Sequence, residues 1–118
     1  MAEKLVDTQN ELFQQCRHIA DQIESGEYES SNKDESDDYL DQGAFDYLSD
    51  ALDIEYTVNS KREYLGARVL VAFGGPNIWI NTRNKTVEGY WWSDRAETNY
   101  FEDKLGLDDA LEELWNMR

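Results

Sequence analysis

The stretch YLGARVLVAFGGPNIWINTRNKTVEGYWW at residues 64–92 decides the fold, because it holds most of the uninterrupted apolar and aromatic sequence of the chain. Three runs within it, residues 65–73, 77–82 and 86–92, are rich in valine, isoleucine and aromatic residues, which favour β-strands. The tripeptides GGP at 74–76 and RNK at 83–85 separate the runs and are typical of turns. The stretch therefore predicts a three-stranded meander.

The sequence on either side predicts one further strand and three helices. Residues 54–59 alternate apolar and polar side chains, which is the pattern of a half-buried strand. Residues 3–24, 38–52 and 107–117 repeat apolar residues with helical spacing, and Gly26 is expected to end the first helix. Residues 93–104 are expected to be irregular. The predicted fold is a single α+β domain over residues 1–118, a four-stranded antiparallel meander sheet packed with helices in the order α-α-β-β-β-β-α.

Net charge is the extreme feature of the composition. The chain has 26 acidic and 11 basic residues, a formal charge of −15. Residues 1–60 carry −13 of this charge and residues 61–118 carry −2. Phosphate backbones and anionic membranes repel such a chain, so we expect neither direct nucleic-acid binding nor membrane binding. The charge favours a basic protein as the partner.

The acidic residues of the first half concentrate in two neighbouring segments. The first is a polar loop expected at about 26–38, and the second is the helix expected at 38–52. In that helix Asp46, Asp50 and Asp53 recur at spacings that would align their carboxylates on one face. A solvated surface without a role is the alternative for any such charge run. The candidate partner-binding residues are Glu27, Glu29, Asp34, Glu35, Asp37, Asp38, Asp41, Asp46, Asp50, Asp53, Glu55 and, among the aromatic residues, Trp92.

Catalytic and metal-binding patterns are weak. Cys16 and His18 are the only residues of their types and lie two apart on a predicted helix, so their side chains diverge and form no catalytic dyad. One cysteine and one histidine are too few for a closed zinc site, and the acidic run at 34–41 matches a calcium-binding EF-hand loop poorly. We therefore expect a non-enzymatic protein without a metal or cofactor. The N-terminal sequence lacks the apolar core of a signal peptide, which predicts a cytoplasmic location.

The segment REYLGARVLVAFGGPNIWINTRNKTVEGYWWSDRAE at residues 62–97 resembles small uncharacterised acidic proteins encoded by bacterial phages and conjugative elements. The resemblance lies in the YLG and GGPNIWI motifs and in the valine, tyrosine and tryptophan that follow the next turn. It implies an origin on a mobile element. Because proteins of such elements often antagonise host defence, the resemblance suggests an anti-restriction or anti-CRISPR role.

Two hypotheses for function follow from these features. In the first, the chain presents its carboxylates in place of phosphates to the basic nucleic-acid channel of a host nuclease or defence complex. In the second, the acidity serves solubility, and an adaptor or structural domain binds its partner through sheet aromatics around Trp79, Tyr90 and Trp92.

Overall fold

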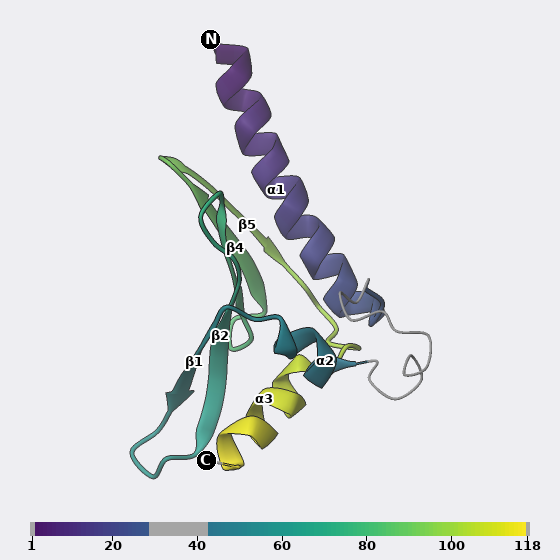
Figure 1. The fold of residues 1–118 in the computed structure, drawn as a ribbon, viewed down its shortest axis with the longest axis vertical. Helices are drawn as coiled ribbons and strands as arrows, with labels where there is room; N and C mark the ends of the chain where they lie inside the picture. Colours follow the sequence, from purple (N-terminus) through teal and green to yellow (C-terminus); the bar gives the residue numbers. More distant parts are fainter. Residues whose placement is uncertain (1, 29–42, 118) are drawn as a thin grey trace.

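The computed structural model describes the backbone of residues 2–28 and 43–117, and the side chains of residues 10–28 and 43–117. It is an α+β protein with a five-stranded antiparallel sheet in the order β1-β2-β3-β4-β5 (Figure 1). The elements in chain order are α1 (Ala2–Ser25), α2 (Ala44–Ser49), β1 (Asp53–Val58), β2 (Tyr64–Ala72), β3 (Asn77–Asn81), β4 (Thr86–Trp91), β5 (Asp94–Asn99) and α3 (Leu107–Asn116). The predicted fold class and meander order are confirmed.

The fifth strand corrects the prediction of four strands and of an irregular segment after Trp92. A two-residue turn at Trp92 and Ser93 brings β5 back alongside β4, with Trp91 opposite Asp94 and Thr86 opposite Asn99. The inward-facing residues of β5 are Ala96 and Thr98, which are buried but only weakly apolar. The periodic pattern was too faint to predict a strand, and pairing with β4 together with cover from α1 compensates for it.

The core lies between one face of the sheet and the helices. Val69, Ile80 and Val87 form a cross-strand row on this face and are fully buried. Helix α1 covers β4 and β5, and α3 packs against β2 (Figure 1). The approach of α1 to β4 depends on Gly89, because a Cβ atom there would lie 2.7 Å from Cys16 Sγ and 2.8 Å from Leu12 Cδ1.

Two sets of hydrogen bonds hold helices α1 and α3 in place. Arg17 of α1 donates to Thr98 Oγ1 (3.0 Å) and to the Asn99 carbonyl oxygen (3.1 Å), which joins α1 to β5. Before α3, the Asp103 carboxylate accepts backbone N–H bonds from residues 106, 107 and 108 at 2.8 to 2.9 Å. These bonds satisfy N–H groups that the first helical turn leaves without partners.

The ends of the helices agree with the sequence at α1 and differ at α2. Gly26, with φ of +77° and an N–H bond to the Gln22 carbonyl, ends α1 as predicted. Helix α2 ends at Ser49 rather than at Leu52. The physical reason is that the Leu52 N–H already donates to the Leu70 carbonyl oxygen (2.8 Å), so the chain has joined the sheet by that residue. Residues 38–42 of the predicted helix lie outside the described residues.

Candidate acidic interface

Half of the predicted partner-binding residues lie in the described part of the chain. Glu27, Asp50, Asp53 and Glu55 are exposed, Asp46 is half-buried, and Trp92 is 93% exposed. The other six lie outside the described residues; they are Glu29, Asp34, Glu35, Asp37, Asp38 and Asp41.

The prediction that Asp46, Asp50 and Asp53 share one helix face is wrong. Asp50 caps the C-terminus of α2, and Asp53 is the first residue of β1. Because side chains alternate along a strand, and Ile54 packs on the core, Asp53 and Glu55 project from the opposite face of the sheet. Glu55 also forms an ion pair with Arg68 at 3.2 Å. Asp46 and Asp50 therefore lie with α2, whereas Asp53 projects from the opposite face of the sheet.

Tyr28, which precedes the acidic segment 29–42 in the sequence, contacts the start of α2, which follows that segment. Its hydroxyl donates to Asp46 Oδ2 (2.5 Å) and lies 3.1 Å from the Gly43 carbonyl oxygen, and its ring packs edge-on against Tyr47. Burial, followed by the Asp46 carboxylate, raises the pKa of Tyr28, while burial alone raises the pKa of Tyr47 to about 12. Residues 28 and 43, which in the sequence flank a stretch of six acids and one lysine, thus lie close together beside α2.

Helix α3 adds exposed acidic residues that are not among the predicted partner-binding residues. Its exposed side is formed by Asp108, Asp109, Glu112 and Glu113, while Leu107, Ala110 and Leu111 are buried. Helix α3 packs beside α2, and neither helix contains a lysine or arginine (Figure 1). We define the acidic surface as Asp46 of α2 and Asp50 at its C-terminal cap together with the four exposed acids of α3. The helical spacing of the four α3 acids is visible in the sequence of residues 107–117, so the sequence alone could have predicted that they share an exposed face.

Basic side chains gather at the turns near α3. Lys61 and Arg62 lie in the β1–β2 turn, and Arg83 and Lys85 lie in the β3–β4 turn at the same end of the sheet. Within the described residues, none of the four takes part in an ion pair. The acidic surface therefore has positively charged side chains near one edge. A basic partner would be attracted to the acidic surface and repelled by these side chains, which favours one orientation of binding.

The sheet face opposite the helices is polar and aromatic, and its side chains contact one another. The Arg68 guanidinium lies 4.2 Å from the centre of the Trp79 ring, and the Arg95 guanidinium lies 5.8 Å from that of Tyr90. The carboxylate of Glu88 accepts from the hydroxyls of Thr86 (3.1 Å) and Tyr90 (3.3 Å). Trp79 and Tyr90 are only partly accessible, unlike Trp92.

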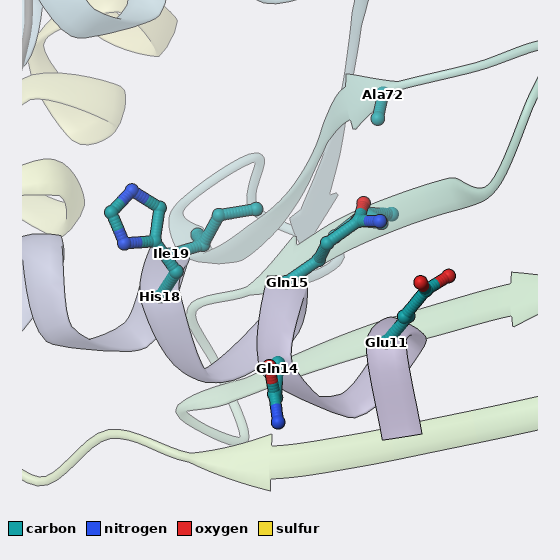
Figure 2. A pocket seen from close by; sticks show the side chains of 7 residues that line it. Glu11, Gln14, Gln15, His18, Ile19 and Ala72 are labelled. Carbon is teal, nitrogen blue, oxygen red and sulfur yellow. The ribbon is translucent and has the colours of Figure 1, made fainter. Parts of the chain in front are cut away.

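A shallow cavity of about 580 Å³ lies between α1 and the ends of β2 and β3. Glu11 and Gln15 stand on successive turns of α1, with Ala72 across the cavity from them (Figure 2). Its other lining residues are Gln14, His18, Ile19 and Ile78. The His18 ring nitrogen Nε2 lies 3.3 Å from the side-chain amide nitrogen of Gln22. Besides this imidazole, the lining carries the Glu11 carboxylate and the amides of Gln14 and Gln15.

Cys16 is buried in the core rather than directed into this cavity. Burial, with a smaller contribution from the Glu88 charge, raises the pKa of its thiol to about 11, which suppresses the reactive thiolate. Across residues 10–28 and 43–117, no three His, Cys, Asp or Glu side chains are arranged to hold a metal ion. No helix in the described part of the chain has the length and hydrophobicity needed to cross a bilayer.

No protein-family model, curated protein or solved structure matches the chain.

Proposed function

We propose that this chain is a non-enzymatic binding protein that places acidic surface against a basic nucleic-acid-binding protein and competes with its nucleic acid. The observation that carries the proposal is the pairing of α2 and α3, two packed helices whose charged residues are all acidic. Carboxylates held on helices need little further ordering when they bind, so more of the Coulomb attraction is retained.

The contacts of Tyr28 are a second observation that supports the proposal. Its hydroxyl contacts the Gly43 carbonyl oxygen and the Asp46 carboxylate, so residues 28 and 43, which flank the acidic segment 29–42 in the sequence, lie close together at α2. The segment 29–42 contains six acids and one lysine, and the acidic surface contains six further acids, which makes twelve carboxylates in all. A basic channel that accepts phosphates is the complementary surface, and a mobile-element inhibitor of anti-restriction or anti-CRISPR type is the specific form that we propose.

Only part of the aromatic surface that the adaptor hypothesis expects is accessible. Trp79 lies under Arg68, and the hydroxyl of Tyr90 is bonded to Glu88, so these two side chains are largely engaged within the sheet. Trp92 remains accessible. A partner that docks through aromatic residues would therefore use the end of the sheet rather than its face.

A charge-matched pair of variants tests the proposal. The first variant replaces Asp109, Glu112 and Glu113 of α3 by Asn, Gln and Gln. The control replaces three exposed acids outside α2 and α3, namely Asp21, Glu97 and Glu102, by Asn, Gln and Gln. Both variants have the same net charge, so a difference between them reports the position of the acids rather than their number.

The assay measures release of labelled duplex DNA from purified bacterial restriction and CRISPR nucleases. The native protein is expected to release DNA from its target at low salt, and less of it as salt rises. Loss of three exposed contacts at about 0.5 kcal/mol each predicts roughly tenfold weaker release by the α3 variant, with a smaller change in the control. Equal losses in the two variants, or no release by the native protein from any nuclease of the panel, would refute the proposal.

A further inference from the structure

Two large aromatic side chains are exposed at one end of the sheet. Trp92, in the β4–β5 turn, is 93% exposed, and Phe73, in the β2–β3 turn, is 71% exposed. The turns are neighbours, because Asn77 pairs with Tyr90 and a Cβ built on Gly75 would lie 3.7 Å from the Trp91 ring. We define Phe73 and Trp92 as the aromatic tip.

Folding alone does not favour tryptophan at position 92. Trp92 has φ of +55°, the left-handed region that two-residue hairpin turns fill with asparagine or glycine. A bulky side chain is disfavoured there, and its exposure forfeits the gain from burial. A residue that is both strained and exposed is a candidate for binding, and tryptophan is enriched among the residues that dominate binding energy.

The charges around the tip indicate the chemistry of the partner. Glu11 lines the same cavity as Ala72, the residue before Phe73 (Figure 2). Asp94 is the first residue after the turn at Trp92 and Ser93. The neighbouring base Arg95 lies over the Tyr90 ring on the other face of the sheet. We infer that the aromatic tip receives an arginine side chain of the basic partner, which stacks on Trp92 while Glu11 or Asp94 balances its charge. The inference rests on the proposed function for the basic partner.

The C-terminal end of α3, which belongs to the acidic surface, lies at the opposite end of β2 from the aromatic tip. Trp115 of α3 donates to the Arg62 carbonyl oxygen (2.9 Å), which places the end of α3 at the β1–β2 turn. That turn is at the other end of β2 from Phe73. A signal from the Trp92 indole therefore reports binding at the aromatic tip separately from binding at the end of α3.

Capped hexa-arginine and hexalysine peptides of equal charge are the probes. Binding is measured by ¹⁵N NMR at low ionic strength, following the indole N–H signal that disappears in Trp92→Gly. Glycine accepts the positive φ, so this variant is expected to fold. Phe101→Ser is the matched control, since Phe101 is 78% exposed but lies beyond β5, away from the tip.

In the native protein we expect hexa-arginine to shift the Trp92 signal and to bind about fivefold more tightly than hexalysine. The preference should disappear in Trp92→Gly and persist in Phe101→Ser. Salt-dependent peptide binding that leaves the Trp92 signal and the arginine preference unchanged would overturn this inference but not the proposed function. Absence of binding by either peptide at low salt would instead count against the proposed function itself.

Discussion

Gly89→Ala tests how closely α1 approaches the sheet. The added methyl group would lie 2.7 Å from Cys16 Sγ and 2.8 Å from Leu12 Cδ1, both well inside ordinary contact distance. Cys16 and Leu12 are buried, so neither side chain has free space into which it can turn. The helix must shift away from β4, and overpacking of this kind costs about 1–3 kcal/mol of unfolding free energy.

The measurement is chemical denaturation, supported by a thermal scan in which each kcal/mol corresponds to roughly 3–6 °C for a domain of this size. Gly75→Ala is the matched control, because its methyl group would meet only the Trp91 ring at 3.7 Å. That variant is expected to change stability by less than about 0.5 kcal/mol.

A double-mutant cycle identifies the contact responsible. Cys16→Ala removes the nearer of the two crowded atoms, so the double variant Cys16→Ala/Gly89→Ala should lose less stability than the sum of the single losses, by at least about 0.5 kcal/mol. Additive losses, or equal costs at Gly89 and Gly75, would refute the close-approach argument.

Three further predictions concern individual side chains. Trp92→Gly should raise the free energy of unfolding by about 1 kcal/mol, because glycine removes the cost of positive φ; lower stability would contradict the assigned strain. Asp103→Ala should lower it by about 1–2 kcal/mol through loss of the bonds to the start of α3, measured by denaturation against Glu102→Ala. Burial raises the pKa of the Cys16 thiol from 9.0 to about 11, so the thiol should resist alkylation at pH 8 in the native state. Its contribution to the free energy of unfolding should be lost as pH rises from 9 to 11. Rapid alkylation of the native protein would contradict a buried thiol.

The candidate site followed less directly from the sequence than the fold did. Composition alone showed that the chain is acidic, but the exposure of each carboxylate depends on partners distant in sequence. Arg68 forms an ion pair with Glu55 of the neighbouring strand. The Tyr28 hydroxyl donates to the carboxylate of Asp46, which lies beyond the acidic segment in the sequence. The acids of α3 were visible as a helical pattern, yet only packing places them beside α2.

The sequence by itself determined the strands of the 64–92 stretch, the long first helix with its stop at Gly26, and the excess of acid. Each of these follows from local periodicity, backbone preference or composition, which require no knowledge of neighbours. Tertiary structure alone decided that weakly apolar β5 is a strand and that α2 stops where Leu52 bonds to Leu70. It also placed Asp53 and Asp50 on different sides of the sheet. These outcomes depend on pairing between residues far apart in the chain, whose hydrogen bonds and burial outweigh local preference.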